Sequence, residues 1–186
     1  MRDGIYRSLP MPRRWKSLFK MCEREAERDR YAPQAAQRAI ETDFRQGIGT
    51  GFLRRLEAAV DASLRQLPGV RALPAQADLG GSNTAIERQL LANVAGMLVT
   101  SDGVSARGIM LKALSQTVDH QCNAQLREAR RHAFDNGVNG RVTAAALAAA
   151  VGHIDPADTA RRLLERAPAH RGPLRPEVEL DEALDE

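Results

Sequence analysis

Arginine and lysine side chains recur at short intervals in three parts of this 186-residue sequence. Cations spaced in this way can neutralise the phosphates of a nucleic acid. Arg-rich helix faces are also often simply solvated, so an ordinary polar surface is the alternative interpretation. The candidate phosphate-contacting residues are Arg13, Arg14, Lys16, Lys20, Arg127, Arg130, Arg131, Arg161, Arg162 and Arg166.

Two aromatic residues, Trp15 and Phe19, lie among the first of these cations. A basic surface interleaved with aromatic rings can stack on unpaired bases while its cations bind phosphates. Trp15 and Phe19 are also four residues apart, the spacing of one helix face, so they equally fit a pair of core anchors. The sequence leaves both interpretations open.

The segment from Asp135 to Ala146 keeps part of the pattern of an EF-hand calcium loop. Asp135 takes the first position, Asn139 the fifth and Gly140 the sixth, where a sharp turn is needed. Gly137 and Ala146 stand at the third and twelfth positions, where oxygen ligands are required. Because Ca²⁺ takes about six to eight oxygens, calcium binding is not expected. We predict a Gly/Asn-rich turn in which Gly137, Asn139 or Gly140 adopts a positive φ.

Two helices are predicted on either side of Gly152. Thr143 fits the N-cap of the first helix. Asp155 fits the N-cap of the second, with Pro156 at its first position and Asp158 at its third. The pattern therefore indicates a helix-turn-helix-like hairpin near the C-terminus.

The sequence TARRLLERA, from Thr159 to Ala167, resembles the recognition helices of winged helix-turn-helix regulators. The resemblance implies that Arg161, Arg162 and Arg166 face outward toward duplex DNA, while the apolar residues between them face inward. Asp155 and Asp158 would face the phosphates, however, and the turn is longer than in the compact motif. A hairpin that only packs is therefore the alternative.

Catalytic and metal-binding patterns are not found. The histidines form no H-E-x-x-H pattern, and the two cysteines, Cys22 and Cys122, are a hundred positions apart. We expect no enzyme activity, no metal, no cofactor and no small-molecule substrate. Two isolated cysteines indicate free thiols in a reducing compartment, and no apolar run is long enough for a membrane span or signal peptide. We therefore expect a cytoplasmic protein without membrane association.

The elements that must position the candidate residues are helices. Ala, Leu, Arg, Gln and Glu dominate, and aromatic residues make up only 4% of the chain. Apolar spacing of three and four predicts helices at about 13–30, 33–46, 51–67 and 84–98, and one of about thirty residues ending near residue 133. Thr84 and Glu87 fit a capping box at the start of the fourth. We predict an all-α bundle of about six to seven helices.

Four parts follow from composition: a basic helical part at 1–67, an irregular Pro/Gly-rich connection at 68–83, a second helical part at 84–167 and an acidic tail at 168–186. Residues 1–20 hold six cationic side chains and one acidic side chain, whereas residues 175–186 hold one cationic and six acidic side chains. Opposite charges at the two ends favour attraction within a chain or between copies.

These patterns favour a non-enzymatic nucleic-acid-associated protein, regulatory or architectural, that contacts DNA or RNA through its Arg-rich helix faces. A helical assembly subunit of a larger nucleoprotein complex, bound to protein partners or to copies of itself, is the alternative. An adaptor or inhibitor that acts through the acidic tail is a third possibility.

Overall fold

The computed structural model describes residues 11–134 and 136–167. These residues contain no strand and confirm the all-α bundle of six to seven helices. The α-helices in chain order are α1 (Arg13–Glu23), α2 (Glu25–Gly47), α3 (Phe52–Leu64), α4 (Ala85–Thr100), α5 (Ala106–Phe134), α6 (Gly137–Gly152) and α7 (Pro156–Arg166), with a 3-10 helix η2 (Gln76–Leu79) before α4.

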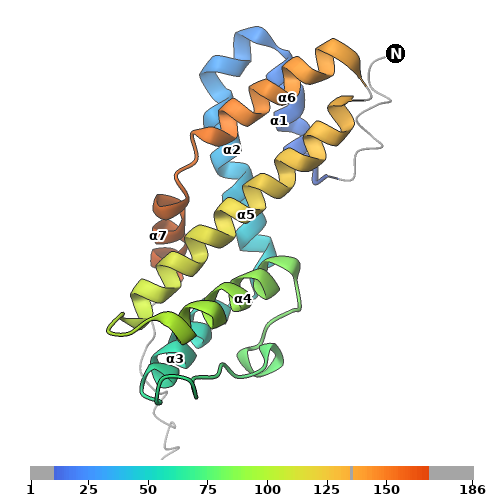
Figure 1. Ribbon diagram of the computed structural model, residues 1–186. Coiled ribbons are helices and arrows are strands. Elements are labelled where there is room, and N and C mark those ends of the chain that lie inside the picture. Colours follow the sequence, from blue (N-terminus) through green and yellow to red (C-terminus); the bar gives the residue numbers. More distant parts are fainter. Residues whose placement is uncertain (1–10, 135, 168–186) are drawn as a thin grey trace, which may run out of the picture.

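The long helix α5 is the central element of an elongated molecule (Figure 1). Helices α3, α4 and α7 pack along its N-terminal half, and α6 packs along its C-terminal half. Helix α2 also runs lengthwise and contacts α1, α4, α6 and α7. One hydrophobic core joins all these helices, so residues from 1–67 and from 84–167 pack together.

Helix α5 has 29 residues, close to the predicted length. Its buried residues include Leu114, Val118, Cys122, Ala129 and Ala133, all of which belong to the apolar stripe expected from the sequence. The spacing of three and four therefore identified the face that α5 turns toward its neighbours.

The helix predicted at 13–30 is interrupted in the structure. Helix α1 ends at Glu23, Arg24 has an extended backbone, and α2 then runs without a break through Pro33. The bend at Arg24 allows α1 to pack against α2 and bury Trp15 and Phe19. A proline inside a helix costs about 3 kcal/mol, and the buried face of α2 on both sides of Pro33 offsets that cost.

The predicted capping box at the start of α4 is present. Thr84 Oγ1 accepts a hydrogen bond from the backbone N–H of Glu87 at 3.1 Å. The Glu87 carboxylate is fully buried and accepts from the backbone N–H groups of Gly49 and Ser82 and from Gln76 Nε2, at 2.7–2.8 Å. Burial alone would raise the pKa of Glu87, but these donors and the Thr84 N–H outweigh it and lower the pKa.

The turn after α5 confirms the positive φ expected for one of its glycines, since Gly137 has a φ of 66°. Helix α6 starts there, so Thr143 lies inside α6 and is not the N-cap predicted from the sequence. The Asp155 cap is confirmed: its carboxylate accepts from the N–H groups of Ala157 and Asp158 at 2.9 and 3.2 Å, with Pro156 at the first position of α7.

The helix-turn-helix-like hairpin predicted from the sequence differs from the structure in how its two helices pack. Helices α6 and α7 follow each other across a short turn, yet each packs on a different half of α5 and contacts the other only slightly. Both helices bury their apolar faces against the long central helix, and α6 also packs against α1 and α2. The two predicted helices are therefore present, but they do not pack on each other as the helices of a hairpin do.

No helix within residues 11–134 and 136–167 has both the length and the apolar character needed to cross a bilayer.

Candidate nucleic-acid interface

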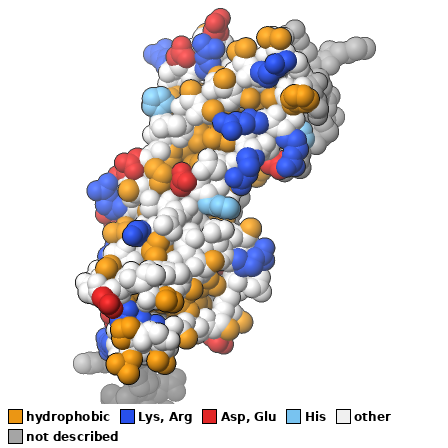
Figure 2. Space-filling model, viewed as in Figure 1, with side chains coloured by type: hydrophobic (Ala, Val, Ile, Leu, Met, Phe, Trp, Pro, Cys, Tyr) orange, Lys and Arg blue, Asp and Glu red, His pale blue; other side chains and the backbone are white. Residues whose placement is uncertain are grey.

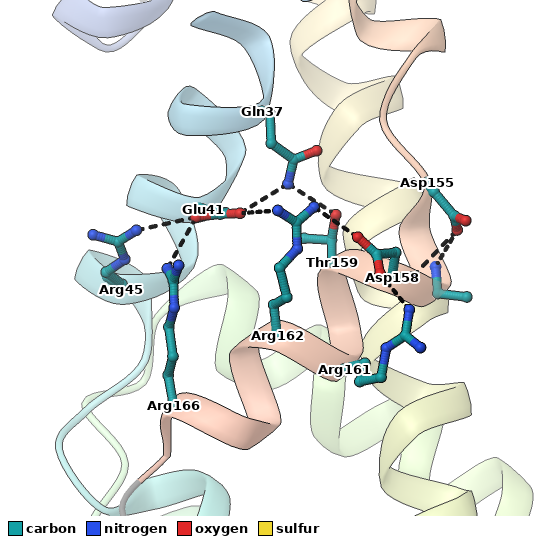
Figure 3. Close-up of polar contacts among 10 residues, drawn as sticks. Gln37, Glu41, Arg45, Asp155, Asp158, Thr159, Arg161, Arg162 and Arg166 are labelled. Atoms are coloured by element: carbon teal, nitrogen blue, oxygen red, sulfur yellow. Dashed lines mark hydrogen bonds and ion pairs between the residues drawn. The ribbon is translucent and has the colours of Figure 1, made fainter. Parts of the chain in front are cut away.

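Two arginines of α7, Arg162 and Arg166, converge with Arg45 on a buried carboxylate of α2 (Figure 3). Glu41 is only 6% exposed. Its oxygens lie 3.1 Å from Arg45 Nη2, 3.4 Å from Arg162 Nη1 and 3.1 Å from Arg166 Nη1. Gln37 Nε2 donates to the same carboxylate at 3.0 Å and to Thr159 Oγ1 at 3.1 Å. These contacts attach α7 to α2.

The charge state of Glu41 follows from these neighbours. Burial is the largest single influence on its pKa and would raise it. The hydrogen bond from Gln37 and the guanidinium groups of Arg162, Arg166 and Arg45 act together in the opposite direction and lower the pKa below its usual value. Glu41 is therefore ionised at neutral pH and balances part of the positive charge around it.

Asp158 pairs with two arginines on α7 itself. Arg162 Nη2 lies 2.9 Å from Asp158 Oδ2, and Arg161 pairs with the other oxygen of Asp158. The structure thus places the three arginines of the recognition-like helix beside carboxylates. A phosphate at this surface would have to compete with Glu41 and Asp158 for them.

The N-terminal cluster is divided between core and surface. Trp15 is fully buried, and its Nε1–H donates to Asp43 Oδ2 at 2.7 Å. Arg14 pairs with the same carboxylate, and Gln121 Nε2 of α5 donates to it at 3.2 Å. Phe19 is also buried. The core-anchor interpretation of the two aromatic residues is therefore confirmed, and neither ring is accessible to a base.

The other cations of α1 lie nearer the surface. Arg13 and Lys20 are exposed, and Lys16 is half-buried.

The third cluster lies on the solvent face of the last turns of α5. Arg127, Arg130 and Arg131 are exposed and lie at steps of three and one, so they share one side of the helix. Arg131 Nη1 lies 3.2 Å from Glu128 Oε1. Among the residues that the structure describes, no carboxylate pairs with Arg127 or Arg130.

A groove of about 420 Å³ separates this end of α5 from α6. Arg130, Ala133 and Phe134 line one side, and Arg141, Ala144, Ala145 and Ala148 line the other. Phe134 is 80% exposed, and Arg141 is exposed without a carboxylate partner in the described ranges. We call Arg127, Arg130, Phe134 and Arg141 with this groove the α5–α6 face. Figure 2 shows hydrophobic and basic side chains next to one another over these helices.

Two residues of this face were not predicted as site residues. Arg141 stands within the segment compared with a calcium loop, so only the early start of α6 shows that it lies on a helix beside α5. Phe134 follows the apolar stripe of α5 by one position, after Ala133. The usable signal was its position four residues after Arg130, because residues four apart lie on the same side of a helix and Arg130 is exposed.

The structure gives no geometric basis for a metal site in the described part of the chain, where no three His, Cys, Asp or Glu side chains come together. Cys22 and Cys122 are buried free thiols. Burial raises the pKa of Cys22 to about 11, partly opposed by Arg28. Burial, Asp119 and Asp43 raise that of Cys122 to about 12. Both thiols are therefore poor nucleophiles at neutral pH.

No family model matches this chain, and no curated protein or solved structure shows significant similarity to it.

Proposed function

We propose that this chain is a cytoplasmic, non-enzymatic nucleic-acid-associated protein that contacts single-stranded DNA or RNA through the α5–α6 face. The observation that carries the proposal is the set of three exposed arginines, Arg127, Arg130 and Arg141, around the exposed ring of Phe134. The described residues pair none of the three with a carboxylate.

The chemistry of this face suits an unpaired strand. Guanidinium groups bind phosphates and release counterions, and an accessible aromatic ring stacks on bases of any sequence. The face has no deep pocket with converging polar groups, so sequence-independent contact is expected. Its function would then be architectural or regulatory.

The test is fluorescence anisotropy with a labelled 20-nucleotide oligothymidylate over a range of salt concentrations. The variant carries Arg127→Gln, Arg130→Gln and Arg141→Gln. We expect its affinity to fall at least about 30-fold, and the slope of log K against log salt to decrease by about two, since single strands lose roughly 0.7 per phosphate contact.

The matched control removes the same charge elsewhere. Arg24→Gln, Arg65→Gln and Arg161→Gln change three exposed arginines that pair with Glu27, Asp61 and Asp158. The control variant should lose less than about threefold in affinity. Equal losses in the two variants would mean that net charge alone matters, and the proposed interface would then be abandoned.

A second candidate function, a helical assembly subunit, is favoured by an apolar patch at the other end of α5. Leu67 is 76% exposed, Val70 68% and Val99 65%. Arg71, which follows Leu67 and Val70 in the chain, connects this segment to the end of α4 that carries Val99. Its Nη1 donates to the carbonyl oxygens of Leu98 and Ser101 at 3.3 and 2.8 Å. Exposed apolar groups gathered in one place favour contact with a protein.

Gentle purification from the native host with nuclease treatment tests this function. Stoichiometric protein partners that are retained by the native chain and lost from the Leu67→Gln, Val99→Gln variant would support it. Retention of the same partners by the native chain and the variant would show that this patch is not their binding site.

A further inference from the structure

The outward side of α6 is apolar along most of its length. Val138 and Val142 are 70% and 55% exposed, and Ala145 and Ala149 continue the same line at steps of three and four. The opposite side of α6 is also apolar, with Leu147 and Val151 in the core. A helix at a protein surface normally has a polar outer face, so α6 has the composition of a helix covered on both sides.

Grooves flank this outer line on both sides. One is the α5–α6 groove, and the other, of about 540 Å³, lies between α2 and α6. Ala145 lines both grooves, because its small side chain leaves only a low ridge between them. The cations Arg130 and Arg141 stand at the edge of the first groove. The surface is thus apolar at its centre and positively charged along the border of the first groove, whereas the second groove is bordered by Arg28 and Asp29, which pair with each other.

The acidic end of the chain has the complementary composition. Residues 176–186, PEVELDEALDE, contain six carboxylate side chains. Among them stand four apolar residues, Val178, Leu180, Ala183 and Leu184, of which the last three recur at steps of three and one. These residues lie outside the described part of the chain. Their composition alone supplies apolar groups for the floor of the grooves and negative charges for its arginines.

We propose that residues 176–186 of the same chain dock on the outer side of α6, with their apolar side chains over Val142 and Ala145 and their carboxylates beside Arg130 and Arg141. The connection is long enough. From Ala145 through the turn and α7 to Ala167 the chain covers about 40 Å, whereas the 17 residues from Ala167 to Leu184 reach up to about 56 Å when extended.

Docking at this place would give the acidic segment a regulatory role. It occupies the groove beside Phe134 and neutralises the arginines that would otherwise bind phosphates. A nucleic acid then has to displace it, which lowers the apparent affinity by the fraction of chains with the segment docked. This competition rests on the proposed function, whereas the docking itself does not.

Disulfide trapping in the full-length protein tests the docking. Ala145→Cys is combined with Leu184→Cys and oxidised briefly with copper phenanthroline, and the products are separated on a non-reducing gel and mapped by mass spectrometry. The buried Cys22 and Cys122 remain in place as poorly reactive thiols. The control pair is Val99→Cys with Leu184→Cys, since Val99 is also exposed but lies on α4.

We expect an intrachain link between positions 145 and 184 in most molecules, and at least about fivefold less with position 99. Changing the six carboxylates of 176–186 to their amides should reduce the link at least about fivefold. Equal trapping at positions 145 and 99 would overturn the proposal. Links only between chains would overturn it too, and would assign the surface to a second copy.

An anisotropy measurement then separates the docking from the proposed function. If both hold, the six-amide variant binds oligothymidylate about tenfold more tightly than the native chain. If trapping succeeds and neither protein binds the oligonucleotide, the docking stands and the proposed function fails. If the oligonucleotide binds equally to both proteins, the competition is wrong.

Discussion

Helix α7 and the end of helix α5 each carry three arginines on a short stretch, and the structure gives the two sets different surroundings. In α7, Arg162 and Arg166 contact the buried Glu41 of α2, and Arg161 contacts Asp158. Of the three at the end of α5, only Arg131 has a carboxylate partner among the described residues. The number of arginines on a helix therefore says little about their availability, which depends on whether a carboxylate of the same helix or of another element lies beside each of them.

The largest effect that bears on this comparison is expected from Glu41→Leu. The change leaves Arg45, Arg162 and Arg166 without their shared carboxylate. These arginines are 38–58% exposed and can be solvated, so we expect a loss of about 2–3 kcal/mol, below that for a fully buried ion pair. Urea unfolding followed by circular dichroism measures the loss. As a control, Asp158→Asn affects a more exposed pair and should cost less than about 1 kcal/mol. Similar losses of stability in the two variants would show that the ion pairs of Glu41 contribute no more to folding than the surface pair of Asp158.

A smaller effect is expected from Phe134→Ala on the other side of the comparison. The ring is exposed and contributes little to the core, so stability should change by less than about 0.5 kcal/mol. Loss of stacking should weaken oligothymidylate binding by about 1–3 kcal/mol. The control is Val99→Ala, an exposed apolar residue on α4. Unchanged affinity in Phe134→Ala would leave only the arginines as contacts.

The pH dependence of stability sharpens the role of Glu41. Its pKa in the folded state is lowered from the usual 4.5, so its stabilising effect is complete above about pH 4.5 and is lost as the pH falls through the lower folded value. Unfolding titrations from pH 7 to pH 3 should show a steeper loss in the native chain than in Glu41→Gln. The variant keeps a residual slope from Glu87, whose pKa is lowered in the same direction. Parallel curves would show that Glu41 is not stabilised in its ionised form.

The smallest effect is expected from Arg161→Gln. Arg161 is mostly exposed and pairs only with Asp158 in the described ranges. Its removal should change stability by less than about 0.5 kcal/mol and oligonucleotide affinity by less than about twofold. Arg130→Gln serves as the comparison, with an expected loss of affinity of about threefold or more. If the Arg161 variant bound the oligonucleotide more weakly than the Arg130 variant, the interface would lie on α7 and not on the α5–α6 face.

The sequence predicted the fold more completely than the candidate site. The cap residues Thr84 and Asp155 and the apolar stripe of α5 were recognisable because each depends on residues within four positions of one another. The break at Arg24 was not, because it depends on the burial of Trp15 and Phe19 against a later helix. From the sequence alone, Arg161, Arg162 and Arg166 were also candidates for phosphate contact on the same terms as Arg127 and Arg130.

By itself, the sequence determined that this chain forms helices, where most of them start, and which sides of them are apolar. Those features follow from local hydrogen bonding and from the helical period. The tertiary structure decided which arginines have partners. Glu41 and Arg166 are 125 positions apart, and only the packing of α7 and α2 brings them into contact. At the C-terminal end of α5, the packing of α6 on α5 leaves Phe134 and Arg141 exposed on the two sides of one groove. Availability for binding is thus a property of how the helices are assembled, because an ion pair forms only where folding brings both charges together.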